Sequence, residues 1–214
     1  QMDSKLSAPK NSNLKTVMDF SFFDKINTAK NEQTETWFKG LDRVYNNFVY
    51  DFLYPNPASV LAFIENHDTD RFLGEGDNLP MLKQASTLLL TTRRIPQLYY
   101  GTEIMMNGVK SKSDGYVRKD FPGGWTGDTE TALTAAGRSK IQNECYNFYK
   151  TLLNWRKGND VIAKGNMVQF MVQNGVYAYA RQHEGKTVFV MLNGTDAETT
   201  VPLKFYKEIL KDSK

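Results

Sequence analysis

Several features are scarce in this sequence, and each scarcity excludes a class of protein. The 214 residues contain one cysteine, Cys145, so no internal disulfide can form. They contain two histidines, which is little material for a histidine-based metal site. No apolar run approaches the roughly 20 residues that a membrane-spanning helix needs. We therefore expect neither a disulfide-bonded fold, nor a zinc site, nor a membrane span.

Charge of one sign is not concentrated anywhere in the chain. Lys and Arg number 27 against 24 Asp and Glu, which gives a net charge of +3. The basic residues are scattered among acidic ones and form no stripe that would follow a phosphate backbone, so nucleic acid is not an expected partner. Residues 1–13 lack the order of a signal peptide, and any export signal is expected outside this chain.

What the sequence does contain is an alternation of apolar runs with helix-period segments up to about residue 160. Strands are expected at 16–22, 59–64 and 95–100, and helices at 37–52, 79–89 and 141–152. This order predicts an α/β fold with a parallel sheet and right-handed crossovers. Functional side chains of such a fold collect at the carboxyl ends of the strands.

After about residue 160 the pattern changes to an antiparallel one. Strands are expected at 167–173, 176–182 and 187–193, with Asn174-Gly175 forming a type I′ hairpin turn. A short run at 199–203 and a helical segment at 205–211 follow. Residues 161–214 are therefore predicted to form a small second domain.

The most polar strand end is the run 63–71, which reads Phe-Ile-Glu-Asn-His-Asp-Thr-Asp-Arg. His67 and Asp68 there fit a metal pair, a general acid-base pair or a polar strand cap. A calcium loop is disfavoured because the acidic residues lack EF-hand spacing. Glu65 fits a structural ion pair as well as a catalytic role. Cys145 lies in an amphipathic helical stretch, which favours a buried thiol over a nucleophile.

Four segments resemble the α-amylase family of glycoside hydrolases. Residues 63–68 resemble its fourth conserved region, and residues 95–103, Ile-Pro-Gln-Leu-Tyr-Tyr-Gly-Thr-Glu, resemble the segment at barrel strand eight. Residues 17–20 are similar to strand six. Residues 118–125, Arg-Lys-Asp-Phe-Pro-Gly-Gly-Trp, resemble the loop after strand eight in neopullulanases and cyclomaltodextrinases, including periplasmic starch-utilisation enzymes.

This resemblance implies an architecture and a chemistry. Residues 1–160 would be the carboxy-terminal portion of a TIM (β/α)8 barrel, strands six to eight, and residues 161–214 part of a carboxy-terminal β-sandwich domain. Asp68 would be the transition-state stabiliser, and substrate binding would fall to His67, Arg71, Asn66 and Trp125. The family's nucleophile and acid-base residue follow strands four and five, which would precede Gln1, so the isolated chain is expected to be inactive.

The resemblance further implies an α-glucan substrate, a periplasmic location, and no cofactor or metal in this chain. It allows calcium binding and a homodimer in a longer parent protein. One alternative is a noncatalytic carbohydrate-binding module that uses Tyr177, Tyr179 and Trp125. Another is a nucleotide-binding α/β fold, which is disfavoured because no strand-to-helix turn carries a Gly-rich phosphate loop.

Overall fold

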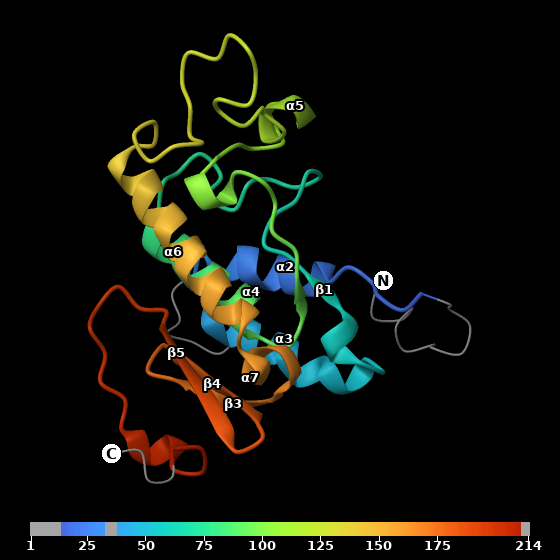
Figure 1. The fold of residues 1–214 in the computed structure, drawn as a ribbon. Coiled ribbons are helices and arrows are strands. Elements are labelled where there is room, and N and C mark those ends of the chain that lie inside the picture. Colours follow the sequence, from blue (N-terminus) through green and yellow to red (C-terminus); the bar gives the residue numbers. More distant parts are fainter. Residues whose placement is uncertain (1–13, 33–37, 211–214) are drawn as a thin grey trace. The chain divides into compact units, whose positions relative to one another are not determined.

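The computed structural model describes residues 14–32 and 38–210, and its elements are labelled in Figure 1. The chain divides into two compact units. Unit 1 comprises the segment up to Ala62, Thr91–Ile95 and the segment from Asn159 on, and unit 2 comprises Phe63–Leu90 and Pro96–Gly158. The predicted domain boundary after residue 160 stays a prediction.

Unit 1 begins with two helices, α2 (Phe20–Ala29) and α3 (Leu41–Val49). The predicted strand at 16–22 is wrong beyond Met18, which makes an isolated parallel bridge with Leu61. The chain turns into α2 there because the Asp19 carboxylate caps the helix, accepting from the Phe22 backbone N–H at 2.9 Å. Helix α3 confirms the middle of the predicted helix 37–52, whose first residue lies outside the described residues.

Two very short strands follow in the central part of the chain. Helix α3 continues into the 3-10 turns η2 (Tyr50–Leu53) and η3 (Pro57–Ser59), and then come β1 (Leu61–Ala62) and β2 (Ile95–Pro96). Strands β1 and β2 are neighbours in a two-stranded sheet, where Ile95 N–H donates to the Val60 carbonyl at 2.9 Å. Both are much shorter than the predicted strands 59–64 and 95–100. The barrel therefore stays a prediction.

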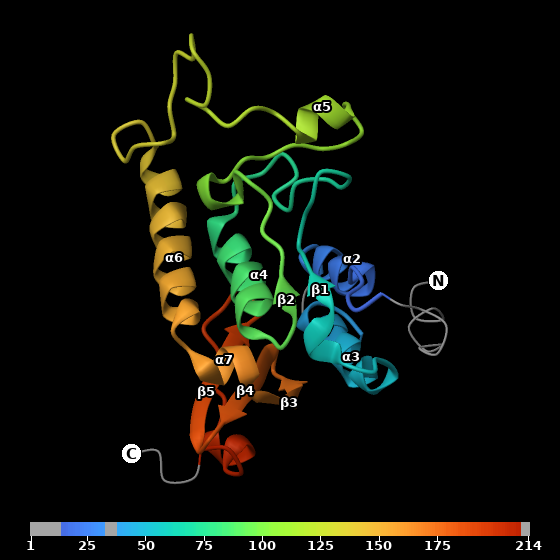
Figure 2. The ribbon, with the colours of Figure 1, turned by 45° about the vertical axis from the view of Figure 1, so that its right-hand side comes forward.

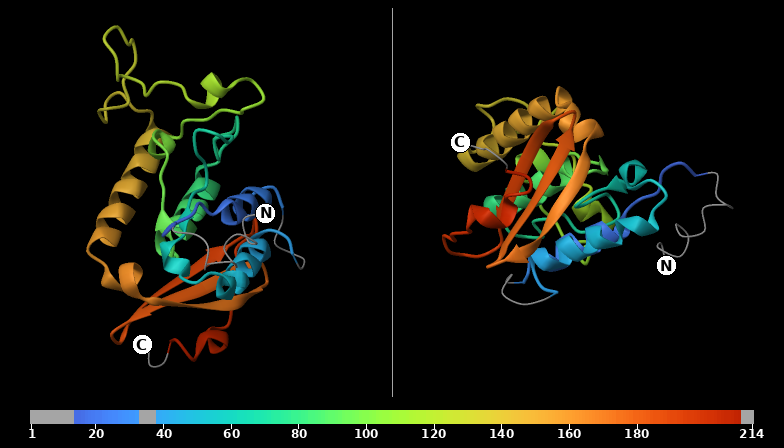
Figure 3. Two further views of the ribbon diagram at one scale, coloured as in Figure 1. Left: turned by 90° about the vertical axis from the view of Figure 1, so that its right-hand side faces the viewer. Right: turned by 90° about the horizontal axis from the view of Figure 1, so that it is seen from below.

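The antiparallel part of unit 1 confirms the predicted meander. Strands β3 (Asn166–Gln173), β4 (Val176–His183) and β5 (Lys186–Asn193) lie in the order β3-β4-β5, as the right-hand view in Figure 3 shows. Asn174 and Gly175 both have positive φ, as the predicted type I′ turn requires. Central strand β4 is buried from Val176 to Arg181, so it reads as a continuous rather than an alternating buried run.

Short helices border this sheet in the sequence. Helix α7 (Asp160–Lys164) precedes β3, and the 3-10 turn η5 (Leu203–Tyr206) follows β5. The predicted strand at 199–203 is not formed. Tyr206 packs edge-on against Phe170 with 4.9 Å between ring centroids, which ties η5 to the sheet. The predicted helix at 205–211 is reduced to η5 and a turn, and its last residue lies outside the described residues.

Unit 2 is built around two helices that were both predicted. Helices α4 (Leu79–Thr91, its last residue in unit 1) and α6 (Lys140–Lys157) lie side by side in Figure 2. The hydroxyls of Ser86 and Tyr149 are hydrogen-bonded between them, and Lys83 Nζ lies 2.6 Å from Glu144 Oε1. Helix α6 begins with a capping box at Ser139 and Gln142.

The remainder of unit 2 is loop with two short helical turns. These are η4 (Thr102–Ile104) and α5 (Asp114–Val117), both in the long connection between β2 and α6. Cys145 of α6 is fully buried, and burial raises the pKa of its thiol to about 12. A thiol with that pKa is no nucleophile at neutral pH.

Among the described residues, no helix is long and apolar enough to cross a membrane.

Candidate functional site

The predicted site lies on a tight loop of unit 2, residues 66–71, which we call the Asp68 loop. Asn66 Oδ1 accepts from the Asp68 backbone N–H at 2.8 Å, and Thr69 Oγ1 accepts from the Asn66 N–H at 3.0 Å. Such side-chain-to-backbone bonds are how Asn and Thr stabilise turns. The turn buries Asn66 and exposes the two residues that follow it.

His67 and Asp68 form a polar pair at the tip of this loop. The Nε2 atom of His67 lies 3.2 Å from Oδ2 of Asp68, and the two side chains are 60% and 57% exposed. Both groups are thus available to hydrogen-bond a ligand. A carboxylate has acceptor capacity for several donors, so the contact with His67 leaves Asp68 free to accept from hydroxyls.

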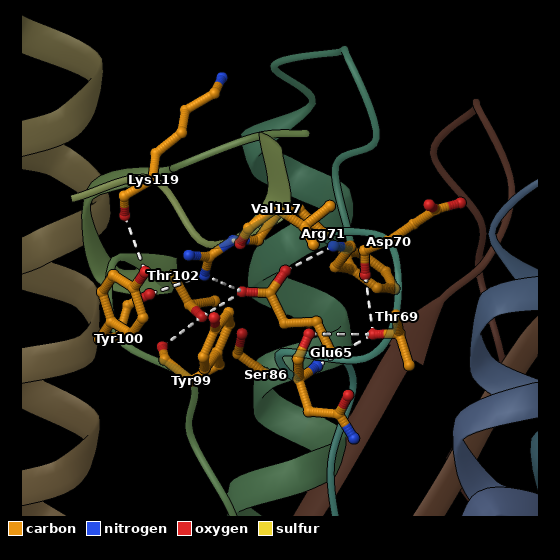
Figure 4. A network of polar contacts seen from close by, with 12 residues as sticks. Glu65, Thr69, Asp70, Arg71, Ser86, Tyr99, Tyr100, Thr102, Val117 and Lys119 are labelled. Carbon is orange, nitrogen blue, oxygen red and sulfur yellow. Dashed lines mark hydrogen bonds and ion pairs between the residues drawn. The ribbon is translucent and has the colours of Figure 1, made fainter. Parts of the chain in front are cut away.

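A buried ion pair between Arg71 and Glu65 lies beneath the Asp68 loop (Figure 4). We call this pair and the groups that contact its guanidinium the Arg71 cluster. The Nη1 atom of Arg71 lies 3.2 Å from Glu65 Oε1 and donates to the Tyr100 carbonyl at 2.6 Å, while its Nε donates to the Val117 carbonyl at 3.1 Å. Both side chains are almost completely buried, at 1% and 2% exposure. Of the two roles left open for Glu65, the structure favours the structural ion pair.

Glu65 also holds the backbone at the far end of the loop. Its Oε2 accepts from the Phe72 backbone N–H, and its Oε1 accepts from the Thr102 hydroxyl. Because residues 65 and 72 flank the Asp68 loop, one carboxylate fixes both stems of the loop. Burial raises the pKa of Glu65 above its ordinary value, and the hydrogen bonds from Thr102, Phe72 and Arg71 oppose that rise.

Two tyrosines complete the surroundings of the Arg71 guanidinium. Its central carbon lies 4.0 Å from the Tyr99 ring centroid and 4.9 Å from that of Tyr100. Burial raises the pKa of Tyr99 to about 12, so its ring is neutral at physiological pH. Gly101, which follows Tyr100, has φ +82°. A Cβ there would lie 2.2 Å from Met106 Sδ, so this turn requires glycine.

A second basic residue contacts the Asp68 loop from the long connection after β2. Arg118 Nη2 lies 2.9 Å from Asp68 Oδ1, and its Nε donates to the His67 carbonyl at 2.8 Å. Lys110 Nζ donates to the Asp68 carbonyl at 3.0 Å. Sequence reasoning assigned neither residue to the site, because 42 and 50 positions separate them from Asp68 and nothing local marks the pairing.

The remaining predicted residues differ in their placement. Trp125 is 67% exposed and sits on a turn whose backbone N–H groups at Gly123 and Trp125 donate to Asp128 Oδ2 at 2.8 and 3.1 Å. This turn, not the Asp68 loop, holds Trp125. Arg71 is fully buried and Asn66 is 2% exposed, so neither presents its side chain to solvent.

Two alternative interpretations lose support from burial and spacing. Tyr177 and Tyr179, the proposed stacking platforms of a carbohydrate-binding module, are fully buried, and the Tyr179 hydroxyl is hydrogen-bonded to that of Thr91. Buried rings cannot stack on a sugar, so this alternative retains only Trp125. Within the described part of the chain, no group of three or more His, Cys, Asp or Glu side chains is placed to hold a metal ion.

Comparison with known proteins places this chain. Residues 167–214 match the cyclo-malto-dextrinase C-terminal domain. The chain is 31% identical over 203 residues to a cyclomaltodextrin glucanotransferase of Thermoanaerobacterium thermosulfurigenes, covering 91% of this chain and 26% of that protein. It is 29% identical to an α-amylase of Niallia circulans, covering 92% of this chain and 35% of that protein. The chain is therefore homologous to cyclomaltodextrin glucanotransferases and α-amylases, enzymes of the α-amylase family.

The family's fold is seen in the structure as well. The solved structure of an Anoxybacillus α-amylase superposes with a TM-score of 0.70 over 89% of this chain and 38% of that one, at 20% sequence identity. The antiparallel sheet β3-β4-β5 corresponds to the carboxy-terminal β-domain of α-amylase-family enzymes. The chain spans about a quarter to a third of the length of the two curated relatives named above, at 26% and 35%.

Proposed function

We propose that this chain is the carboxy-terminal portion of a retaining glycoside hydrolase that cleaves α-glucosidic bonds in pullulan, starch or cyclodextrins. It would supply barrel strands six to eight and part of the β-domain. The observation that carries the proposal is the exposed His67–Asp68 pair on a loop whose stems are fixed by a buried carboxylate, in a chain homologous to α-amylase-family enzymes.

The proposed chemistry assigns one role to each side chain of the pair. Retaining glycosidases use a nucleophile and an acid-base carboxyl about 5 Å apart and pass through an oxocarbenium-like transition state. Asp68 would accept hydrogen bonds from two hydroxyls of the glucose unit at the cleavage point, and His67 would donate to a neighbouring hydroxyl. These bonds strengthen as positive charge develops on the ring, which lowers the barrel enzyme's activation barrier.

The buried residues support this pair instead of touching substrate. Asn66 shapes the turn through its bond to the Asp68 N–H, and Arg71 links the loop to the Val117 and Tyr100 carbonyls. Their burial favours a positioning role over the substrate contact first considered for them. Trp125 is exposed and fits stacking on a sugar face.

The first prediction is that Asp68→Asn, in the longer protein that carries this chain, reduces turnover by orders of magnitude without unfolding the enzyme. The variant keeps the shape of the side chain and removes its charge. By analogy with the loss of one transition-state contact, kcat should fall about 10²- to 10³-fold. Reducing-end release from pullulan, starch and cyclodextrins measures the change, and circular dichroism measures the fold.

Asp70→Asn is the matched control, since Asp70 lies in the same loop and accepts from the Lys110 backbone N–H, a bond that asparagine can keep. An Asp68→Asn enzyme with normal activity would remove the site assignment. The 214-residue chain by itself should release no reducing ends, because the nucleophile and acid-base residue are proposed to precede Gln1. Hydrolysis by the pure chain would contradict that placement.

The proposal extends to partner and location. The substrate is an α-glucan, the compartment is the periplasm by family resemblance, and the parent enzyme could be a homodimer. The named relatives, a cyclomaltodextrin glucanotransferase and an α-amylase, support an α-glucan substrate. Cell fractionation followed by activity measurement tests the location.

A further inference from the structure

Each carboxylate oxygen of Asp68 contacts a side chain of the same unit, and the more informative partner is Arg118. His67 Nε2 lies 3.2 Å from Oδ2, and Arg118 Nη2 lies 2.9 Å from Oδ1. Through Nε, the same guanidinium donates to the His67 carbonyl at 2.8 Å. One planar group therefore fixes the side chain of Asp68 and the backbone of the preceding residue together, which a point charge cannot do.

Arg118 is itself held in place by the buried part of the site. The residue before it, Val117, is fully buried, and its carbonyl accepts from Arg71 Nε at 3.1 Å. Figure 4 shows this inner half of the arrangement, with Glu65, Arg71 and Val117 in contact. The contacts thus form a closed ring, which returns through the backbone to the Asp68 loop. Glu65 pairs with Arg71, and Arg71 donates to the Val117 carbonyl. The next residue, Arg118, contacts His67 and Asp68.

Exposure explains why such a ring would be needed. The Asp68 and Arg118 side chains are 57% and 39% exposed, and an ion pair of that exposure contributes little by itself in water. Asp114 competes for the same Nη2 atom at 3.3 Å. The ring restricts Arg118 at its backbone, so that less freedom is lost when the pair forms.

We propose that Arg118 is a positioning residue for Asp68, one that holds the carboxylate in the orientation in which it meets the sugar hydroxyls. The inference rests on the proposed function and adds a residue to it. Each carboxylate oxygen has a second lone-pair direction, so Arg118 and a hydroxyl can share Oδ1. Water exclusion by bound glucan would strengthen the ion pair at the moment when orientation matters.

The test uses the longer protein that carries this chain, with pullulan or a cyclodextrin as the substrate. Arg118→Gln removes the charge and the fork, whereas Arg118→Lys keeps the charge alone. Because a misplacement of about 1 Å costs roughly 10²-fold in rate, kcat should fall about 10- to 100-fold in Arg118→Gln while KM changes less than about threefold. Arg118→Lys should recover only part of kcat.

Lys119→Gln is the matched control, since it makes the same charge change one residue later. Lys119 Nζ lies over the Tyr116 ring, 3.6 Å from its centroid, and makes no ion pair with Asp68. Its kcat and KM should equal those of the parent enzyme. Should Arg118→Gln fail to fold by circular dichroism, Arg118→Lys against Lys119→Gln carries the same test.

The decisive measurement places Arg118→Gln in the Asp68→Asn background. If Arg118 acts through Asp68, the second substitution costs nothing further, because effects of residues that act as a unit are not additive. An unchanged kcat, a rise in KM alone, or a full additional loss in that background would each overturn the inference. Normal activity of Asp68→Asn would instead overturn the proposed function, so the two failures are distinguishable.

Discussion

Two buried arginines, Arg94 in unit 1 and Arg71 in unit 2, are fully inaccessible to solvent but have different partners. In the Arg94 cluster, Nε lies 2.8 Å from Asp19 Oδ2 and Nη2 lies 2.7 Å from Asp51 Oδ1, so two carboxylates face one guanidinium. In the Arg71 cluster one carboxylate, Glu65, shares the guanidinium with two backbone carbonyls. Aromatic rings do not distinguish the clusters, because each guanidinium lies over two of them.

The difference separates two uses of the same chemistry. The Arg94 cluster joins residue 19, at the start of α2, to residue 51 after α3, and its three side chains are all buried, so it fixes a core. The Arg71 cluster joins segments whose neighbouring residues, His67, Asp68 and Arg118, are exposed. A buried ion pair is weak evidence for stability alone, and only the second cluster lies beneath groups that can meet a ligand.

The comparison predicts its largest effect on stability at Arg94. Replacing it by methionine, Arg94→Met, leaves Asp19 and Asp51 buried, and breaking a buried pair in this way costs about 3–5 kcal/mol. Arg93 is the matched control, because it contacts Asp51 at 29% exposure and its loss leaves Arg94 in place. We expect the midpoint of urea denaturation to fall far more in Arg94→Met than in Arg93→Met. Equal losses would show that the buried guanidinium has no special weight.

The second prediction concerns Glu65→Gln in unit 2. Arg71, Thr102 and the Phe72 N–H all donate to Glu65. The glutamine side chain has an NH₂ group in place of one carboxylate oxygen, so this donor would face one of the three donors and leave it unsatisfied. An unsatisfied buried donor costs about 1–3 kcal/mol, less than the loss at Arg94 because two backbone carbonyls still accept from Arg71. Urea denaturation measures this cost.

Amide hydrogen exchange at residues 66–72 distinguishes a buried ion pair that stabilises a core, at Arg94, from one that positions a loop, at Glu65 and Arg71. Glu65→Gln should speed exchange across the Asp68 loop beyond the change in global stability, since the carboxylate holds both stems. Arg94→Met should change exchange there only in proportion to global stability. Exchange that follows global stability in both variants would mean that Glu65 does not position the loop.

Sequence reasoning succeeded where a signal is local and strongly periodic. Helices α4 and α6 carry apolar residues at helical spacing over three turns or more, and the dipeptide Asn174-Gly175 predicts the turn between β3 and β4. The strand predicted at 16–22 was wrong because the apolar run there was given more weight than the helix-capping residue Asp19. The available sign of a helix start was Asp19 followed at helical spacing by Phe22, Ile26 and Ala29, which are all buried in α2.

The sequence could bring candidate site residues together only where they are contiguous, and the site itself stays a prediction. His67 and Asp68 were found together because they adjoin in a recognisable motif. The choice between an ion pair and a catalytic role for Glu65 required the structure, since Arg71 lies six residues away across a turn that no periodicity describes. Arg118 is one of 27 basic residues, and only folding selects it as the partner of Asp68.

The smallest expected effect lies in the pH dependence of the ion pairs nearer the surface. Two hydrogen bonds from Arg43, at 2.5 and 2.6 Å, lower the pKa of Glu32 in unit 1 from its ordinary value of 4.5 to about 2. A carboxyl with a lowered pKa stabilises the folded state above its unfolded pKa, and this contribution is lost as the pH falls from about 4.5 toward 2.

The last prediction of this comparison is therefore that Glu32→Gln reduces stability at pH 7 by about 0.5–1 kcal/mol and that the difference from the parent chain disappears near pH 2. In unit 2, Glu75→Gln is the exposed counterpart, because Glu75 is half exposed and bound to the equally exposed Lys112. Salt should erase the effect of Glu75→Gln and leave most of that of Glu32→Gln, whose bidentate geometry and partial burial resist screening. A Glu32→Gln difference that persists at pH 2 would show that the side chain stabilises unit 1 by packing and not by charge.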